Sequence, residues 1–229
     1  MIFILLGIAF MLLVLGPQLW IRWVFFRYKA NLPEIPGTGA ELARHLLKRF
    51  EINDVAVEET KPFGDHFDSS TPAIRLSPEN YHGKSLTAIA VATHEFGHAI
   101  QWHRNETIFQ LRRKYIPLAM GLQRVGLALL SISPILGILT RHPIGVAGPM
   151  IGGAFVALCG AATYLIVLPE EWDASFNKAM PVLTDGEYVS DAQLPAVKKI
   201  LSAAALTYAA GALASILHVW RWLPLILKR

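Results

Sequence analysis

The sequence predicts an α-helical integral membrane protein with a small α+β domain and about four transmembrane helices. Two observations support this fold class. Of the 229 residues, 53% are hydrophobic and only 17% are charged, which is too apolar for an ordinary water-soluble domain. Four long apolar runs are also spread along the chain, and a helix needs about 20 predominantly apolar residues to cross a bilayer. Between the first two runs lies the longest polar stretch, which we expect to form one compact domain.

Residues 1–26 form the first expected transmembrane helix. Positions 1–21 carry no charge, and Arg22 and Arg27 follow them. No small-residue cleavage site follows the run, which disfavours a cleaved signal peptide. Trp20 and Trp23 stand where the aromatic belt of a membrane interface is expected.

Residues 30–114 predict the small α+β domain. Thr38 and Glu41 have the spacing of a capping box ahead of an amphipathic helix. Short strands are expected around Val57 and over residues 73–76, and residues 63–68 have the composition of a turn. The domain is expected to end in a long apolar helix with Ser85 at its N-cap and to be followed by a basic segment.

The rest of the chain predicts a hairpin, a polar segment and a last span. Residues 115–168 contain two apolar runs separated by Arg141-His142-Pro143, as in a transmembrane hairpin. Polar residues return over residues 169–199, and residues 200–227 form the fourth expected span. Arg221 near the end of that span leaves open whether it crosses the bilayer completely.

Basic residues gather beside the polar domain, which predicts that this domain faces the cytoplasm of a multi-pass cell-membrane protein. The net charge is +4, and we interpret these residues as topology signals rather than as a nucleic-acid site. Only the short basic C-terminal tail and Arg141 lie on the opposite side. The basic residues on the domain side are Arg22, Arg27, Lys29, Arg104, Arg112, Arg113, Lys114, Lys178, Lys198 and Lys199.

The helix expected after Ser85 carries His94-Glu95-Phe96-Gly97-His98, an H-E-x-x-H pattern. Residues four apart share one face of a helix, so both imidazoles can bind one ion, and this pattern is the helical signature of a zinc peptidase. Glu95 is then placed to accept a proton from the attacking water. The alternative is a chance pair of histidines on a buried helix, but a buried Glu95 without a role would be costly.

A third protein ligand must come from outside this helix, because catalytic zinc usually keeps three protein ligands. His103 is five residues past His98 and therefore lies on another face. The chain's one cysteine, Cys159, lies in an apolar run and provides neither a disulfide framework nor a cysteine metal site. The acidic stretch after the hairpin remains, with Glu170, Glu171 and Asp173 as candidates.

Four blocks of the chain together resemble one family. They are Gly64-Asp65-His66-Phe67-Asp68, Arg75-Leu76-Ser77-Pro78, the block from His94 to Gln101, and Leu168-Pro169-Glu170-Glu171-Trp172-Asp173-Ala174-Ser175. In this order they resemble the YugP-type family of membrane-bound neutral zinc metallopeptidases, and the resemblance covers nearly the whole chain. This family is similar in layout to the HtpX-type membrane proteases.

The resemblance implies a zincin-like catalytic domain with Zn²⁺ as its cofactor and Glu171 as the third ligand. In the HtpX-type enzymes the third ligand is the glutamate of an E-x-x-A-D helix, and residues 171–175 match this pattern as E-x-x-A-S. Ala174 shares a helical face with Glu171 and would allow a close approach to the histidine helix. Ser175 in place of the aspartate leaves open which group hydrogen-bonds the second ring nitrogen of His94 or His98.

His66 has two interpretations. It could donate a hydrogen bond to the developing oxyanion, beside an Ile74-Arg75-Leu76 strand that could pair with an extended substrate. It could instead fix a hydrogen-bonded turn together with Asp68, and we favour this second interpretation.

These observations predict a membrane-embedded zinc endopeptidase that hydrolyses peptide bonds at the cytoplasmic membrane face. Its expected partners are membrane-associated protein or peptide substrates and the lipid bilayer, with a role in membrane-protein quality control. One alternative is a non-enzymatic scaffold with a structural zinc site, which a fourth ligand such as His66 or Asp173 would favour. Another is a zinc hydrolase that acts on lipids or on non-peptide amides.

Overall fold

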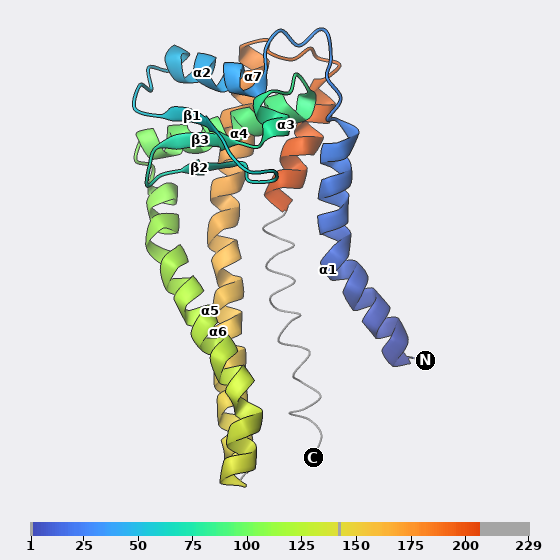
Figure 1. Ribbon diagram of the computed structural model, residues 1–229, viewed down its shortest axis with the longest axis vertical. Coiled ribbons are helices and arrows are strands. Elements are labelled where there is room, and N and C mark those ends of the chain that lie inside the picture. The colour runs from blue at the N-terminus through green and yellow to red at the C-terminus, as the bar shows by residue number, and fades with distance from the viewer. Residues whose placement is uncertain (1, 142, 207–229) are drawn as a thin grey trace. The chain divides into compact units, whose positions relative to one another are not determined.

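The computed structural model describes residues 2–141 and 143–206 (Figure 1). Beyond its numbered elements, a helical stretch covers residues 194–206. The elements follow one another as α1 (Ile2–Arg27), α2 (Gly39–Arg49), β1 (Ala56–Glu59), β2 (His66–Asp68), β3 (Ala73–Leu76), α3 (Pro78–Tyr81), α4 (Leu86–His103), α5 (Thr107–Thr140), α6 (Pro143–Trp172), the π-helix η1 (Asp173–Ala179) and α7 (Met180–Asp185).

The chain divides into two compact units. One combines Gln18–Gln110 with Pro169–Thr207, and we call it the α+β unit. The other contains Met1–Pro17 and Leu111–Leu168, together with a C-terminal segment that lies outside the described residues. The α+β unit holds the sheet and every candidate site residue.

The prediction of about four transmembrane helices is wrong. Throughout residues 2–141 and 143–206, no helix combines the length and the apolar character needed to cross a membrane. The prediction relied on stretches without charge. Such stretches also contain residues that are uncharged but not strongly apolar. In α6, for example, Gly152 and Gly153 are uncharged without being strongly apolar, and the first third of α5 carries Arg112, Arg113 and Lys114. Most of the expected fourth span, residues 200–227, lies outside the described residues.

The sheet has three strands in the order β1-β3-β2. β3 is central and pairs in parallel with β1 and antiparallel with β2, with His66 opposite Arg75. Its residues Ala73, Ile74 and Leu76 are buried, as expected for the central strand. The predicted turn over residues 63–68 therefore contains a strand. It forms because β2 lies at the edge of the sheet, where a strand of three partly polar residues is long enough to pair.

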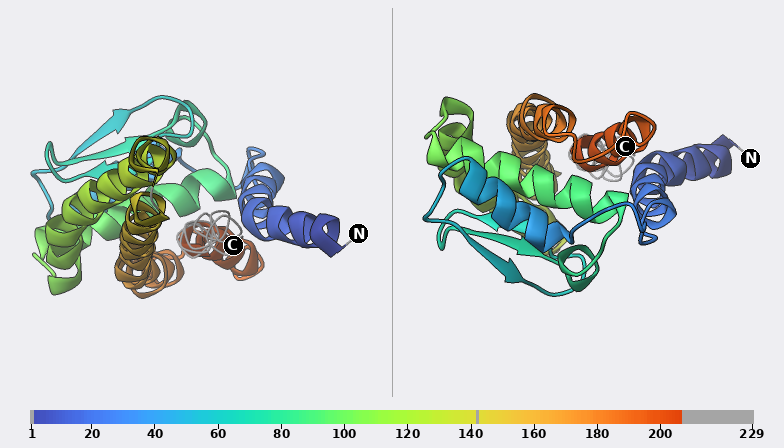
Figure 2. Two further views of the ribbon diagram at one scale, coloured as in Figure 1. Left: turned by 90° about the horizontal axis from the view of Figure 1, so that it is seen from below. Right: turned by 90° about the horizontal axis from the view of Figure 1, so that it is seen from above.

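Helix α4 lies between the sheet on one side and the segment of η1 and α7 on the other (Figure 2). Helix α2 also packs on α4 through an apolar face that includes Leu42, Leu46 and Leu47. The predicted capping box at its start is confirmed. Thr38 N donates to Glu41 Oε2 at 2.7 Å, and Glu41 N donates to Thr38 Oγ1 at 3.2 Å.

The contact between α4 and η1 depends on two small residues. A Cβ added to Gly97 would lie 2.6 Å from the carbonyl oxygen and 3.1 Å from the Cα of Ala174. No side chain at position 97 could therefore be accommodated without moving backbone. Ala174 is fully buried in this contact, which confirms the predicted close approach of its face to the histidine helix.

Candidate metal centre

Helix α4 provides both histidines of the predicted zinc motif. Its N-cap is Ser85, as predicted, whose Oγ accepts a hydrogen bond from Ala88 N at 3.1 Å. Every residue from Leu86 to Gln101 is buried. His94 and His98 lie one turn apart with ring centroids separated by 4.8 Å, so both imidazoles point from the same face.

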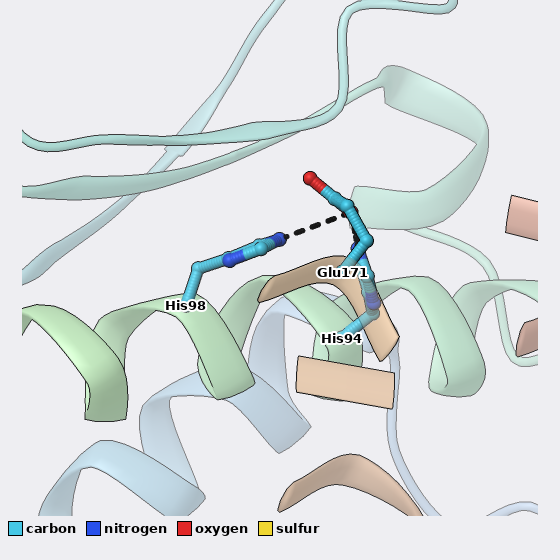
Figure 3. Close-up of side chains that lie close together, drawn as sticks. All are labelled: His94, His98 and Glu171. Atoms are coloured by element: carbon cyan, nitrogen blue, oxygen red, sulfur yellow. Dashed lines mark ion pairs between the residues drawn. The ribbon is translucent and has the colours of Figure 1, made fainter. Parts of the chain in front are cut away.

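The end of α6 brings Glu171 to the two histidines (Figure 3). Glu171 Oε2 lies 3.2 Å from His94 Nε2 and 3.4 Å from His98 Nε2. Each of these three residues offers one ligand atom, and these atoms all lie within 4.8 Å of one another. They form the candidate metal-binding group within the part of the chain that the structure describes.

The donor set fits a zinc ion. Zinc binds imidazole nitrogen and carboxylate oxygen at about 2.0–2.2 Å, and tetrahedral geometry then places neighbouring ligand atoms roughly 3.3–3.5 Å apart. The nitrogen–oxygen separations of 3.2 and 3.4 Å agree with this spacing. Three protein donors also leave a fourth position for water or substrate, which is the usual composition of a catalytic zinc site.

The second nitrogen of each imidazole has a hydrogen-bond partner. His94 Nδ1 and Ser175 Oγ are 3.0 Å apart, and His98 Nδ1 and Gln101 Oε1 are 2.9 Å apart. These contacts answer the question that the serine at position 175 left open, because the hydroxyl takes the place beside His94. Partners of this kind orient metal-binding histidines and fix their tautomers.

The other two acidic candidates occupy different places. Glu170 is fully buried, and its Oε1 lies 3.6 Å from His98 Nδ1, the nitrogen that faces away from Glu171. Asp173 Oδ2 accepts hydrogen bonds from Gln101 Nε2 at 2.9 Å and from Lys178 Nζ at 2.6 Å. Neither residue is brought to the Nε2 atoms, whereas Glu171 is.

Without a metal, His98 and Glu171 form a buried ion pair. Burial opposes protonation of His98, but the charge of Glu171 and its hydrogen bond outweigh burial and raise the pKa of His98 to about 9. Burial would likewise raise the pKa of Glu171, yet His98 and His94 together hold that pKa well below its usual range. A zinc ion would therefore have to replace a proton on His98.

Glu95 lies in the same buried environment. Burial raises the pKa of its carboxyl group, His94 and His98 oppose the rise, and the negative charges of Glu171 and Asp65 add to it. Asp65 is itself held in place by Ser77, whose backbone N–H donates to Asp65 Oδ1 at 2.7 Å. Sequence reasoning did not select Asp65 as a neighbour of Glu95, although both belong to the recognised blocks.

His66 remains a predicted site residue without a contact to the histidine–glutamate group. It lies exposed on β2, and a 2.7 Å hydrogen bond joins its Nδ1 to the carbonyl oxygen of Gly64. Asp68 organises the following turn by accepting hydrogen bonds from Ser70 and Thr71. Pairing of an extended substrate with the strand at residues 74–76 is wrong as a prediction, because β1 already pairs with residues 73–76 on one side of β3 and β2 with residues 73–75 on the other.

Gln101 is the site residue that sequence reasoning missed. Its side chain is fully buried and contacts His98, Asp173 and the backbone of Glu170. A signal was present, because Gln101 is three residues after His98 on the same helix and is polar within an apolar stretch. The predicted exclusion of His103 agrees with the structure, where its nearest acidic partner is Asp54 at 3.8 Å.

Comparison with known proteins identifies a family whose description agrees with this chemistry. The model of the family described as "Putative neutral zinc metallopeptidase" matches residues 2–227. "Putative membrane protease YugP" from Bacillus subtilis (strain 168) is 33% identical over 231 residues, which cover 100% of this chain and 98% of that protein. No solved structure matches the chain significantly. The chain belongs to this neutral zinc metallopeptidase family.

Proposed function

We propose that the protein is a zinc-dependent endopeptidase, with the metal held by His94, His98 and Glu171 and with Glu95 as the general base. The observation that carries this proposal is the convergence of three ligand atoms from α4 and from the end of α6 with zinc-compatible spacing. Glu95 follows the first histidine on α4 and shares its buried environment. The family description supports the same chemistry.

Zinc bound at this site would supply a Lewis acid that activates water and polarises the scissile carbonyl. Glu95 accepts a proton from the attacking water as its oxygen bonds to the carbonyl carbon. Glu95 then delivers that proton to the leaving amine as the carbon–nitrogen bond breaks. Because burial raises the pKa of Glu95, its carboxylate holds the proton more firmly than an exposed one would, which suits a general base near neutral pH.

An extended peptide is the substrate class that the neighbouring sheet suits. β2 is an outer strand of the described sheet, and it contacts α4 through the packing of Phe67 against Trp102 at 5.9 Å between ring centroids. Extended peptides commonly add to such an edge by backbone hydrogen bonds. Phe63, 91% exposed in the loop that leads to β2, offers an apolar contact beside this edge.

We further propose that the enzyme acts on membrane-associated proteins at the cytoplasmic face of the cell membrane, in membrane-protein quality control. The relative from B. subtilis is named a membrane protease, which supports this location. The α+β unit also exposes Trp23 and Phe26 beside cations, with Lys199 Nζ 5.0 Å from the ring centroid of Trp23 and Lys29 Nζ 4.3 Å from that of Phe26. Aromatic and basic side chains together suit an anionic lipid surface.

The enzymatic proposal is tested by combining metal analysis with a Glu95→Gln variant. We expect purified wild-type protein to contain one zinc per chain and to cleave unfolded protein substrates. Glu95→Gln should keep the metal and lose nearly all hydrolysis, because an amide of similar shape cannot accept the proton. Wild-type cleavage by this variant would contradict the proposed base, and zinc binding without any hydrolysis by wild type would favour a structural zinc site.

A further inference from the structure

The two metal-site histidines differ in what lies beside their second ring nitrogen. His94 Nδ1 faces a hydroxyl, Ser175 Oγ, which can donate or accept a hydrogen bond. His98 Nδ1 faces the amide oxygen of Gln101 at 2.9 Å, which can only accept, while Glu170 Oε1 lies farther away at 3.6 Å. The side chain of Gln101 therefore places a restriction on His98 that Ser175 does not place on His94.

The surroundings of Gln101 determine how its amide is turned. Gln101 Nε2 lies 3.1 Å from the carbonyl oxygen of Glu170 and 2.9 Å from Asp173 Oδ2, and both of these atoms are acceptors. Turning the amide over would bring its oxygen against both acceptors and its NH₂ group against His98. Since Gln101 is fully buried, water cannot relieve such a contact. The observed orientation, with Oε1 toward His98, is thus the one that satisfies every group.

A charged pair keeps Asp173 in its accepting role. Lys178 Nζ donates to Asp173 Oδ2 at 2.6 Å and lies 3.2 Å from Glu106 Oε2, with its side chain only 12% exposed. Lys178 carries no acceptor, so the carboxylate of Asp173 must accept from Lys178 and from Gln101 together. Lys178 therefore donates to Asp173 from one side, and on the other side the hydrogen bonds run from His98 through Gln101 to Asp173.

We propose that Gln101, held by Asp173 and Lys178, is the positioning residue that assigns the proton of neutral His98 to Nδ1 and leaves the Nε2 lone pair for the metal. The inference rests on the proposed function, because it concerns His98 as a zinc ligand. A histidine whose N–H donates into a chain that ends on a carboxylate is also a more basic ligand. Among the described residues, His94 Nδ1 has the hydroxyl of Ser175 in place of such a chain, so the two histidines contribute unequally to metal affinity.

The test is a zinc titration of metal-free protein against a competing chelator. Gln101→Met keeps the size of the side chain and removes its acceptor, and we expect the zinc Kd to rise by about 10- to 100-fold. Asp173→Asn weakens the hydrogen-bond chain at a partly exposed position, where misfolding is less of a concern. We expect a smaller rise in the zinc Kd for this variant. Thr93→Val is the matched control, because it removes a buried hydroxyl of α4 that, within the described residues, bonds to Ile89 O of its own helix, and its Kd should equal that of wild type.

Nitrogen-15 NMR of the zinc-loaded proteins provides the readout that a purely structural role would not change. In wild type, His98 should show a protonated Nδ1 and a metal-bound Nε2, and Gln101→Met should lose the hydrogen-bonded Nδ1–H signal. If wild type binds zinc no better than His98→Ala, the proposed metal site itself fails. If wild type binds zinc but Gln101→Met and Asp173→Asn retain its Kd and its His98 signals, the metal site stands and the positioning role is overturned.

Discussion

The interface of α4 with η1 and the three-stranded sheet both use polar contacts, but they place them in opposite environments. At the interface, Gln101 and Ser175 are fully buried and bond to the histidines. In the sheet, Arg75 joins Asp68 and Glu58 in ion pairs whose side chains are 24%, 21% and 49% exposed. Water can replace many of the contacts around Arg75 in the sheet, but it does not reach the buried contacts of Gln101 and Ser175.

This difference predicts where the protein tolerates change. Removing one partner of a buried polar pair costs the desolvation of the group left behind, about 1–3 kcal/mol, whereas exposed ion pairs contribute about 0–1 kcal/mol. The close contact of Gly97 with Ala174 adds a steric constraint that the sheet lacks. We therefore expect substitutions at the interface to affect metal binding and stability strongly, and those in the sheet to have mild effects on stability alone.

The largest effect is expected for Glu171→Ala, which removes the ligand that η1 and α6 bring to α4. This variant should lose most of its bound zinc and nearly all hydrolysis, as measured by metal analysis and peptide cleavage. Glu170→Ala and Asp173→Ala should keep most of their metal at saturating zinc, because neither carboxylate reaches the Nε2 atoms. Loss of zinc in Glu170→Ala with retention in Glu171→Ala would shift the ligand by one position.

Gly97→Ala should be the next most damaging change, although it adds only a methyl group. The new Cβ would meet backbone atoms of Ala174 at 2.6–3.2 Å, so the two helices must separate. Overpacking of this kind costs about 1–3 kcal/mol, and the separation also moves Glu171 away from the histidines. Thermal unfolding and zinc titration should both show the change.

Gly121→Ala on α5 is the control for this substitution. A Cβ there would meet no heavy atom within 4 Å. A Gly97→Ala protein with the wild-type melting temperature and zinc affinity would show that the interface is not constrained as described.

The buried charge pair predicts that zinc binding releases a proton. Since the pKa of His98 is raised to about 9 in the metal-free protein, its imidazole is charged at pH 7.5 and must deprotonate to bind zinc. The apparent zinc affinity should therefore increase about tenfold per pH unit below pH 9. Calorimetry in two buffers of different ionisation enthalpy measures the proton directly, and an equal heat in both buffers would contradict the pair.

The smallest effect is expected in the sheet, for Asp68→Asn. Hydrogen bonds from Ser70 and then Thr71, with help from Arg75, hold the pKa of Asp68 well below its usual range. A carboxyl group whose pKa is lowered on folding contributes stability above its unfolded pKa of about 4 and loses it as the pH falls further. Asp68→Asn should thus lower the melting temperature by a few degrees at pH 7, without loss of zinc.

The pH dependence distinguishes this effect from a general loss of packing. The difference between Asp68→Asn and wild type should shrink as the pH falls below about 4, because the unfolded wild-type chain then binds a proton at this carboxyl group that the folded protein does not yet bind. Glu58→Gln, at the more exposed partner of Arg75, should change the melting temperature less. A constant difference at all pH values would mean that the charge of Asp68 does not contribute.

Local signals in the sequence were sufficient for much of the α+β unit. The caps at Thr38 and Ser85 and the strand over residues 73–76 depend on neighbours within a few positions, and the structure shows all three. The close packing at Ala174 was also predictable, since a small residue one turn from an expected ligand indicates a close approach of two helices. The choice of Glu171 among the three acidic candidates depended on the family resemblance, because nothing local to the sequence distinguishes it from Glu170 and Asp173.

The remaining features depend on information that single-sequence patterns lack. β2 is a strand only because β3 lies beside it, so its residues looked like a turn. The four transmembrane helices were inferred from the absence of charge, which does not measure how apolar a stretch is. Gln101 was overlooked because its role depends on Asp173, and that pairing exists only after the chain has folded.

The separation of the metal-site segments along the chain also sets the order of events during synthesis. His94 and its partner Ser175 are 81 positions apart, so the ribosome needs about 4–16 s to make the second segment after the first. During that interval the nascent chain contains the complete His94–His98 motif but lacks Glu171. The motif cannot yet form the proposed three-ligand site, and neither can any fragment that terminates before Glu171. The site can therefore assemble only after translation has passed the last element that it requires.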